Sequence, residues 1–566
     1  DHWLRIEADA NYRVDRSKFI FLHVSSCFPR KGVGALLDAY GQAFSDADPV
    51  TLVIKTFPNP HNEARVLLEE CQDRYPNYPE VLLIEDDLSE EQLKALYEQS
   101  QALVAPSRAE GFGLPLAEAM LSGLPVITTG WGGQTDFCNA ETAWLIDYTY
   151  QRASTHFDLF DSVWAAPDVH HLARLMKEVF ESSEDAKAQK NQKSKELLLS
   201  QFTWQAVSQR LIDTANHCTE ADSNLTVRLG WVSSWNTPCG IASYSSHLLG
   251  GMAHEATIFA RHDPSEIPDE ANVVRCWHMD DKDNLSHLSE EIERKDINVL
   301  VVQFNYGFYE FDAFAKFLKR MTVQGRKVLV MLHATIDPPG ISNKCLERLR
   351  EALSGCYRLL VHTPADLNRL KALGLDRIAA IFPHGVVDRN HKRVTKPGRV
   401  IKLASYGFFL PSKGLLELID AVAMLKYKGV NVHLTMVNAE YPVASSAQLI
   451  AKAKKKIEFL ELDKQIKMVT VFLPESESFH LLEDADLIVF PYRESNESSS
   501  AAVRYGLVTG IPIVTSPVGI FEDVNAAVFT LPGTDASEMA EGLADLISAI
   551  RLGKPEYVER LVKSKQ

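Results

Sequence analysis

Two glutamates set eight residues apart, Glu110 and Glu118, are the residues whose types and spacing most clearly suggest ligand chemistry. They lie in the segment EGFGLPLAEAM, in which glycines let the backbone approach a bound molecule and a helix start presents amides to an anion. At ~1.5 Å per helical residue, the two carboxylates would stand about 12 Å apart. That separation suits a sugar and a ribose on either side of a diphosphate.

This segment belongs to the first of two similar stretches of sequence. The first copy reads RKGVGALLDAY at 30–40 and APSRAEGFGLPLAEAMLSGLPVITT at 105–129. The second copy reads SKGLLELIDAV at 412–422 and FPYRESNESSSAAVRYGLVTGIPIVTS at 490–516. A repeat of this length indicates two copies of one α/β ligand-binding lobe.

A lysine occupies the same place in both copies, in a short loop between a strand and a helix. These residues are Lys31 and Lys413. An ammonium group in such a loop can neutralise a diphosphate as it becomes a leaving group. The alternative interpretation is a surface lysine without a ligand.

Short apolar runs alternate with amphipathic patterns around these motifs. The expected strands of the first copy are 19–25, 51–56, 81–84 and 102–105. Helices are expected at 34–45 and 90–100, the second of them started by a capping box of Ser89 and Gln92. Strands that alternate with helices predict a parallel sheet covered on both faces, and such sheets bind ligands at the carboxyl ends of their strands.

The 566 residues divide into three α/β lobes and two polar connections. The expected order is a lobe at 1–217, a linker at 218–226, a lobe at 227–390, a hinge at 391–399 and the second copy at 400–566. The chain opens at Asp1 without an initiator Met and reaches an apolar strand within twenty residues. We therefore expect a fragment of something longer.

The composition argues against several classes of function. With 59 Lys and Arg against 75 Asp and Glu, the net charge is −16, which disfavours a nucleic acid partner. Eight scattered cysteines without metal-ligand spacing predict reduced thiols in a cytosolic protein. No apolar run reaches the ~18–20 residues that cross a bilayer. The tract KAKKK at 452–456 is either a solvated helix face or a contact with anionic lipid.

Together the motifs resemble the retaining GT-B glycosyltransferases of the large nucleotide-sugar-using family (glycosyltransferase family 4-like). These enzymes have two Rossmann-like lobes, of which the C-terminal one binds the donor. The resemblance implies an orphan donor lobe, then a complete two-lobe module whose acceptor lobe is 227–390. It also implies that Glu110 contacts hexose hydroxyls, that Glu118 contacts the ribose, and that Gly111 and Gly113 let the backbone approach the donor.

The family usually carries an arginine some five or six residues before the loop lysine. Here those positions hold Ser25 and Ser26 in the first copy, and Gly407 and Phe408 in the second. Neutralisation of the phosphates must therefore be shared differently, and in the first copy Arg30 is the candidate for this role.

The second copy departs from the pattern at one of its two carboxylates. Aligning GLPVITT with GIPIVTS places Glu497 opposite Glu110 and Tyr505 opposite Glu118. Loss of the ribose carboxylate is what an inactive lobe would show. The retained hexose glutamate favours an active variant instead, with Glu497 and Lys413 as catalytic groups and Tyr505 beside the nucleoside.

The turn before this helix also changes in the second copy. Ser498, Ser499 and Ser500 replace the Gly-Phe-Gly of the first copy, and Arg504 follows on the helix. Small residues at the turn and an arginine able to bind phosphate keep a donor site feasible. We expect Ser498, Ser499 and Arg504 to contact the donor.

In the acceptor lobe, His333 ends the apolar run KVLVML and resembles the family's active-site histidine near the reacting sugar. The alternative is a histidine satisfied at a strand end, which is the interpretation we favour for His362 and His384. The segment PCGI at 238–241 resembles the family's first loop, where Gly240 would let backbone amides face the donor phosphates.

The family mechanism retains anomeric configuration, with the donor's own phosphate helping to take the acceptor proton. No DxD-like motif lies near these strands, so we expect neither a metal nor another cofactor. A further resemblance, to bacterial polymannose O-antigen mannosyltransferases in tandem form, implies a hexose passed from GDP-mannose to a growing surface polysaccharide or lipid-linked acceptor at the cytoplasmic membrane. The alternative is a non-catalytic scaffold or glycan-binding protein on degenerate lobes.

Overall fold

The computed structural model describes most of the chain as two units, each considered by itself. The units are Asp1–Leu225 (unit 1) and Thr226–Gln566 (unit 2). The described residues are 2–14, 18–155, 162–220, 226–237, 239–262, 268–279, 282–386, 398–495, 497–554 and 557. Much of the expected linker and hinge, at 221–225 and 391–397, lies outside them.

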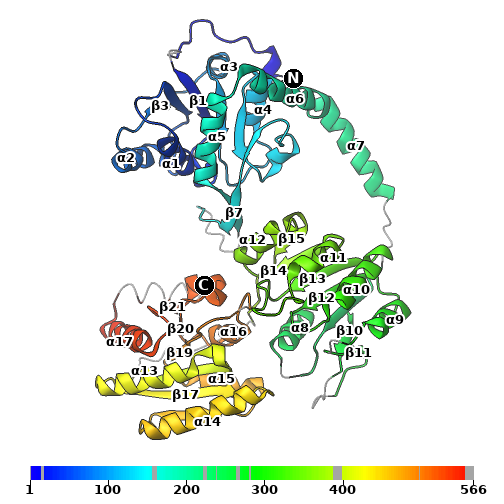
Figure 1. Ribbon diagram of the computed structural model, residues 1–566, viewed down its shortest axis with the longest axis vertical. Coiled ribbons are helices and arrows are strands. Elements are labelled where there is room, and N and C mark those ends of the chain that lie inside the picture. The colour runs from blue at the N-terminus through cyan, green and yellow to red at the C-terminus, as the bar shows by residue number, and fades with distance from the viewer. Residues whose placement is uncertain are drawn as a thin grey trace. The chain divides into compact units, whose positions relative to one another are not determined.

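Unit 1, coloured from blue to blue-green in Figure 1, is built on a six-stranded parallel sheet with the order β3-β2-β1-β4-β5-β6. Its strands are β1 (Phe19–Val24), β2 (Val50–Lys55), β3 (Glu80–Ile84), β4 (Ala102–Ala105), β5 (Val126–Thr129) and β6 (Trp144–Ile146). Its helices are α1 (Val33–Ala43), α2 (Ala64–Arg74), α3 (Glu90–Gln99), α4 (Leu114–Leu121), α5 (Val169–Glu181), α6 (Glu184–Gln201) and α7 (Trp204–Glu220). The strands and helices expected around the first motif are confirmed, including the capping box of Ser89 and Gln92.

The sheet of unit 1 is buried on both faces because neighbouring residues of β1 point to opposite sides. Phe21 packs with Tyr40 of α1 and with residues of α2 and α5. Leu22 packs on the other face with Tyr97 of α3 and Met120 of α4. This doubly covered parallel sheet confirms the expected α/β fold.

Two features of unit 1 differ from the sequence expectation. An antiparallel hairpin of β7 (Tyr148–Arg152) and β8 (Val163–Pro167) follows β6 and has no equivalent among the described residues of the second copy. Helix α7 continues to Glu220, into the stretch expected to be a linker. The sequence there contains neither Gly nor Pro to end the helix earlier.

Unit 2 contains two further parallel sheets, in a middle lobe and a last lobe. The middle sheet has the order β11-β10-β9-β12-β13-β14-β15, and the last sheet has the order β18-β17-β16-β19-β20-β21. The middle strands are β9 (Leu229–Ser233), β10 (Ala256–Arg261), β11 (Val273–Trp277), β12 (Val299–Phe304), β13 (Lys327–Leu332), β14 (Arg358–Val361) and β15 (Ala379–Ile381). The last strands are β16 (Ile401–Phe408), β17 (Val432–Ala439), β18 (Ile466–Val469), β19 (Leu487–Phe490), β20 (Ile513–Thr515) and β21 (Phe529–Thr530).

Helices connect the strands of both lobes in unit 2. Those of the middle lobe are α8 (Gly240–Gly250), α9 (Ser286–Arg294), α10 (Phe311–Val323), α11 (Arg350–Ser354) and α12 (Pro364–Ala372). Those of the last lobe are α13 (Leu415–Tyr427), α14 (Ala444–Phe459), α15 (Glu475–Glu483), α16 (Ala501–Val508) and α17 (Ala536–Leu552). The last sheet repeats the strand order of unit 1.

All three sheets have the Rossmann-like order 3-2-1-4-5-6, with one extra strand in the middle lobe. In this order the chain leaves the first and fourth strands in opposite directions. Their carboxyl ends therefore border a crevice in which such sheets bind ligands. In unit 1 the crevice lies after β1 and β4, and in the last lobe it lies after β16 and β19.

The loop after β16 approaches the chain after β19 so closely that it leaves no room for a side chain. Gly414 has a φ of 64°, and a Cβ placed on it would lie 1.7 Å from the carbonyl oxygen of Pro491. Gly414→Ala should therefore lower the free energy of unfolding of the last lobe. The loss should exceed the cost of the left-handed backbone alone, which is about 1–2 kcal/mol.

The matched control is Gly429→Ala, because Gly429 also has a positive φ, 75°, but faces open space. Thermal unfolding of the full chain would compare the two variants. Equal losses of stability in both would contradict the close approach at Pro491.

Candidate functional site

The crevice of unit 1 is closed by backbone contacts between the loops after β1 and β4. Gly32 has a φ of 73°, and a Cβ on it would lie 2.1 Å from the carbonyl oxygen of Pro106. The amide of Arg108 donates to the carbonyl of Arg30 at 2.7 Å. These contacts hold the loop that carries Lys31 against the loop that carries Glu110.

Lys31 and Glu110 form an ion pair at this point. The side chain of Glu110 is only 9% exposed, and it also accepts a hydrogen bond from the hydroxyl of Ser107 at 2.9 Å. A guanidinium nitrogen of Arg30 lies 4.0 Å from the same carboxylate. Three of the predicted donor residues therefore meet in one place.

The turn between Glu110 and α4 depends on its glycines. Gly113 caps α4 with a φ of 86°. The amide of Gly133 donates to the carbonyl of Glu110 at 2.9 Å, and a Cβ on Gly133 would lie 1.8 Å from the carbonyl oxygen of Gly111. A side chain on Gly133 would therefore displace the turn that joins Glu110 to α4.

Glu118 lies within α4 and has different neighbours. It accepts a hydrogen bond from the hydroxyl of Tyr97 at 3.2 Å. Burial raises the pKa of its carboxyl to about 7, despite the opposing effects of Tyr97 and Lys94. The role of Glu118 as a ribose ligand stays a prediction.

The last lobe reproduces the loop arrangement with a looser ion pair. The amide of Arg493 donates to the carbonyl of Ser412 at 2.9 Å, as Arg108 and Arg30 do in unit 1. Lys413 lies 3.8 Å from Glu497, whose side chain is 57% exposed. Glu497 follows its strand-end proline by two more residues than Glu110 does, and this longer loop carries it further into solvent.

An aromatic ring supports Lys413 in place of a tight ion pair. The ammonium nitrogen lies 3.9 Å from the ring centroid of Tyr492, which occupies the position of Ser107 in the first copy. Burial lowers the pKa of Lys413, but Tyr492 and Glu497 outweigh that effect and the pKa is raised overall. Lys413 is therefore a fixed positive charge at the crevice.

Ser498 connects the last lobe to the middle lobe. Its amide donates to the carbonyl of His333 at 3.1 Å, and its hydroxyl donates to Asp366 at 2.7 Å. Ser500 takes over the role of Gly113 by another means, because its hydroxyl caps α16 by accepting from the amide of Val503. The serine turn is thus both a helix cap and an interlobe contact, while Ser499 is half-buried beside it.

His333 is held through both of its ring nitrogens inside the middle lobe. Nδ1 lies 3.2 Å from Nε2 of His362, and Nε2 lies 2.7 Å from Oε1 of Gln303. His362 in turn lies 3.0 Å from the carbonyl of Phe382, which can only accept. The part of His333 that bonds to the last lobe is its backbone carbonyl.

The carbonyl of Phe382 determines which ring nitrogens of His362 and His333 carry a proton. Neutral His362 must carry its proton on Nδ1, so its Nε2 accepts from Nδ1 of His333. Nε2 of His333 is then an acceptor, and it gains a donor if the Gln303 amide is turned so that its NH2 group takes the place of Oε1. That orientation also gives a partner to an amide nitrogen that is otherwise buried without one. Burial, with His362 and His384 nearby, holds the pKa of His333 well below its usual range, consistent with neutral rings.

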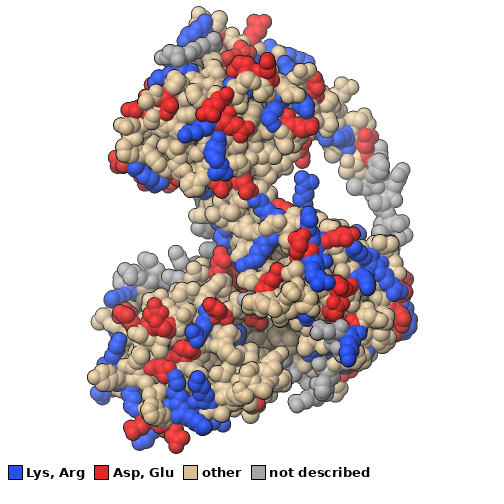
Figure 2. Space-filling view, in the orientation of Figure 1, with Lys and Arg blue, Asp and Glu red and all other residues tan. Residues whose placement is uncertain are grey.

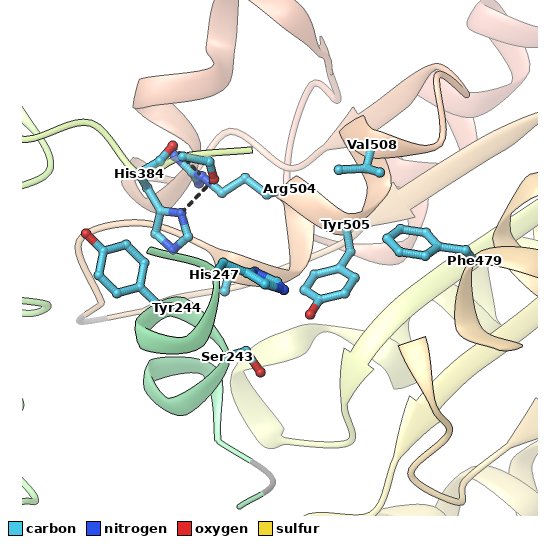
Figure 3. A pocket seen from close by; sticks show the side chains of 10 residues that line it. Ser243, Tyr244, His247, His384, Phe479, Arg504, Tyr505 and Val508 are labelled. Atoms are coloured by element: carbon cyan, nitrogen blue, oxygen red, sulfur yellow. Dashed lines mark hydrogen bonds between the residues drawn. The ribbon is translucent and has the colours of Figure 1, made fainter. Parts of the chain in front are cut away.

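A small pocket lies between the two lobes of unit 2 (Figure 3). Its lining residues are Ser243, Tyr244 and His247 of α8, Ala501, Arg504, Tyr505 and Val508 of α16, and His384, Gly385 and Phe479. The rings of His247 and Tyr505 face each other across it with centroids 6.2 Å apart. A Cβ on Gly240 would lie 3.8 Å from that of Ala501, so the first residues of α8 and α16 meet beside the pocket.

Arg504 lines the pocket but is bonded within the protein. It forms an ion pair with Asp523, and both side chains are almost fully buried. It also donates to the carbonyls of Ser500, at 2.9 Å, and of His384, at 3.3 Å. A phosphate that binds Arg504 as predicted would have to share the guanidinium with Asp523 and these two carbonyls. No pattern in the sequence predicts the pairing with Asp523, because the two residues lie in different elements and meet only through the fold.

The described residues include no group of three or more His, Cys, Asp or Glu side chains placed to hold a metal ion. In the same part of the chain, no helix is both long and apolar enough to cross a bilayer. The described cysteine side chains are free thiols, most of them buried.

The family model for glycosyl transferases group 1 matches residues 5–160 and 386–561, more than half of the chain. The chain belongs to the group 1 glycosyl transferases. Both matches contain one of the lysine–glutamate crevices described above. The match and the strand orders show Rossmann-like lobes of the GT-B fold, and the domain that the family model describes occurs twice in the chain.

Curated relatives match a short part of the chain. An MMP α-(1→4)-mannosyltransferase of Mycolicibacterium hassiacum is 32% identical over 108 residues, covering 19% of this chain and 25% of that protein. The serotype-specific mannosyltransferase WbdA of Escherichia coli is 34% identical over 107 residues, covering 19% and 13%. The matched segment is thus a quarter or less of these relatives.

Solved structures resemble a larger part of the chain at low sequence identity. A crystal structure of Anabaena HepE in complex with UDP has 12% identity and a TM-score of 0.47, covering 60% of this chain and 94% of that chain. A sucrose-phosphate synthase from Thermosynechococcus elongatus has 14% identity and a TM-score of 0.46, covering 59% and 94%.

The raised pKa of Glu118 predicts a pH-dependent stability of unit 1. The folded state keeps a proton on this carboxyl up to a pH of about 7, whereas the ordinary pKa of a Glu side chain is 4.5. Its contribution to stability is therefore fully present below pH 4.5 and is lost as the pH rises through about 7. Glu118→Gln should remove this loss and stabilise unit 1 at pH 8 relative to the parent chain, with little gain at pH 5.

Thermal unfolding between pH 5 and pH 8 measures the effect. Glu141→Gln is the control, because the Glu141 side chain is 74% exposed. If Glu118→Gln and the parent chain lose stability in parallel as the pH rises, the protonated carboxyl is not present in the folded state.

Proposed function

We propose that unit 2 is a retaining hexosyltransferase and that its site is the crevice between the middle and last lobes. The observation that carries this proposal is the convergence of Lys413, Glu497 and the His333 carbonyl. The Ser498 turn brings them together, next to the facing helix starts of α8 and α16. Membership of the group 1 glycosyl transferases supports the class of reaction.

Each of these groups has a role that its chemistry supports. Lys413 would neutralise the diphosphate as the bond between the anomeric carbon and the phosphate oxygen breaks. The exposed carboxylate of Glu497 would accept hydrogen bonds from hexose hydroxyls. The acceptor hydroxyl would bond to the anomeric carbon on the face that the diphosphate leaves, and its proton would pass to a donor phosphate oxygen. No protein nucleophile and no metal is required for this step.

We propose GDP-mannose as the donor and a growing bacterial surface polysaccharide, such as an O-antigen, as the acceptor. The mannosyltransferase names of the curated relatives support the sugar, although each match is short. Unit 1 would bind a nucleotide sugar through Lys31, Glu110 and Glu118. Transfer would belong to unit 2, where two lobes can enclose the reacting groups and exclude water.

One observation favours a second candidate, a non-catalytic scaffold or glycan-binding protein. Arg504 and Ser498, two of the predicted donor residues of unit 2, are bonded to Asp523 and Asp366 of the protein itself. Such self-satisfied groups give a rigid interlobe surface without any ligand. An assay of transfer separates the two candidates.

Transfer of mannose by the full chain should depend on the crevice of unit 2. Glu497→Ala and Lys413→Ala should each reduce kcat by about 10²–10³, since each removes a charge-stabilising group. Glu494→Ala, which removes an exposed carboxylate three residues earlier, should leave kcat unchanged. Transfer from GDP-mannose to a mannose oligosaccharide is the measurement.

Glu118→Ala should weaken nucleotide binding in unit 1 and leave transfer unchanged. Loss of transfer in Glu118→Ala would instead place the working site in unit 1. Full activity of Glu497→Ala would favour the scaffold.

We propose further that α14 rests on an anionic membrane, where a lipid-linked acceptor would be found. Lys452, Lys455 and Phe459 lie at i, i+3 and i+7 of this helix, so they share one face, and Phe459 is 85% exposed. Figure 2 shows basic side chains gathered over this part of the last lobe, in a chain of net charge −16. Basic and aromatic side chains on one helix face suit a membrane surface.

The chain should therefore float with vesicles that contain phosphatidylglycerol and not with pure phosphatidylcholine vesicles. Lys452→Glu with Lys455→Glu should abolish flotation, as each lysine near the surface is worth about 1 kcal/mol. Lys316→Glu with Lys319→Glu is the matched control, because these exposed lysines have the same spacing on α10. Equal flotation of both double variants would show that α14 is not the membrane contact.

A further inference from the structure

Three aromatic side chains meet at the carboxyl ends of neighbouring strands in the last lobe. Phe408 ends β16, and Tyr441 and Phe472 follow β17 and β18. The ring of Phe408 lies 5.0 Å from that of Tyr441, edge to face, and 6.0 Å from that of Phe472, nearly parallel at 14°. These three residues are called the aromatic edge.

The aromatic edge is incompletely covered. Phe472 is 59% exposed, and Phe408 and Tyr441 are half-buried. Val471, beside Phe472, is 64% exposed as well. Neighbouring apolar side chains left open to water at the end of a sheet are uncommon, and they mark a surface that something else covers.

Unit 1 has polar residues at the same three positions. The Lys-Gly loops align Gly32 with Gly414, which places Ser26 opposite Phe408. The strand pairs Phe19↔Val50 and Ile401↔Val432 then place Asn59 opposite Tyr441.

The third position follows from the next strand. The pairs Leu52↔Val81 and Leu434↔Ile466 place Asp87 opposite Phe472, with connections of equal length to α3 and α15.

The polar set shows that the fold does not need aromatic rings here. Asn59 donates from its side-chain amide to the carbonyl of Ser26 at 2.9 Å, so these positions also meet in unit 1. Ser26 and Asn59 are half-buried and Asp87 is exposed, the same burial as in the aromatic edge. The same scaffold positions thus carry opposite chemistry in the two copies, which points to a difference in what they bind.

The aromatic edge borders the proposed donor crevice. Gly407, the residue before Phe408, would place a Cβ 3.5 Å from Ala502 in the first turn of α16. Tyr406, on the same strand, packs on Tyr505 with centroids 5.2 Å apart, and Tyr505 lines the interlobe pocket. Lys413 lies in the loop that follows Phe408. A diphosphate held by this loop would extend its nucleoside toward one side of α16.

We propose that the aromatic edge is the surface on which unit 2 stacks the base of a nucleoside diphosphate, and that unit 1 uses polar contacts at the same place. This inference rests on the proposed function, because it assumes a nucleotide in the crevice. A planar base has a π face whatever its identity, so stacking on Phe472 adds affinity without reading hydrogen-bonding groups. Ser26, Asn59 and Asp87 of unit 1 can instead exchange hydrogen bonds with a base edge. The two sites therefore differ in base selectivity.

The experiment titrates the full chain with GDP, UDP and inorganic pyrophosphate by calorimetry. A Lys31→Ala background removes the site of unit 1, and a Lys413→Ala background removes that of unit 2. Phe472→Ala should weaken GDP and UDP at the Lys413-dependent site by roughly 5- to 150-fold and leave pyrophosphate unchanged. The exchange of Phe408→Ser with Phe472→Asp, which installs two residues of unit 1, should weaken both nucleotides and widen the difference between them.

Tyr427→Ala is the control, because it removes an exposed ring from the same lobe at the C-terminal end of α13, which leads into the amino end of β17. Unchanged GDP and UDP affinities in Phe472→Ala, at a site that still depends on Lys413, would overturn the stacking proposal and leave the proposed function intact. An equal loss of pyrophosphate affinity would show that the substitution disturbs the Lys413 loop, and it would also overturn the stacking proposal. If no nucleotide binds in a Lys413-dependent manner, the proposed function fails as well.

Discussion

The close approach of two loops at the crevice is the constraint on which the rest of the site depends. In unit 1 and in the last lobe, a glycine with positive φ presses against a proline carbonyl, at Gly32 and Pro106 and again at Gly414 and Pro491. Any side chain at the glycine would push the loops apart. Because none is present, the lysine before each glycine reaches the glutamate of the opposite loop.

The two copies keep this constraint and vary what surrounds it. In unit 1 the glutamate is nearly buried and tightly paired with Lys31. In the last lobe a loop longer by two residues exposes Glu497, and the ring of Tyr492 supports Lys413. A pair that is already neutralised and buried gains less from an incoming diphosphate than an open one does. This contrast supports placing transfer in unit 2 and binding in unit 1.

Sequence reasoning predicted what local patterns determine. The alternation of apolar strands and helices defined the sheets, and residues that follow the first and fourth strands had to lie near each other, as Lys31 and Glu110 do. The β7–β8 hairpin was missed, because its two strands are short and a long connection separates one strand from the other. Such a connection leaves no periodic signal.

Contacts between residues far apart in the chain also could not be predicted from the sequence. The serine turn was expected to contact a donor, yet the partner of Ser498 is Asp366, 132 residues away in another lobe. The ring contacts of His333 with Gln303 and His362 likewise depend on the register of three neighbouring strands. A histidine at a strand end indicates a site, but only the fold shows which of its atoms remain available.

Amide hydrogen exchange of the full chain, with and without GDP-mannose, tests the central claim most directly. If both crevices hold the diphosphate, protection should rise at 28–33 and 110–114 in unit 1 and at 410–415 and 497–503 in unit 2. These segments contain the loop amides and helix starts that face the crevices. Protection at the opposite ends of the strands, or at neither crevice, would contradict the account.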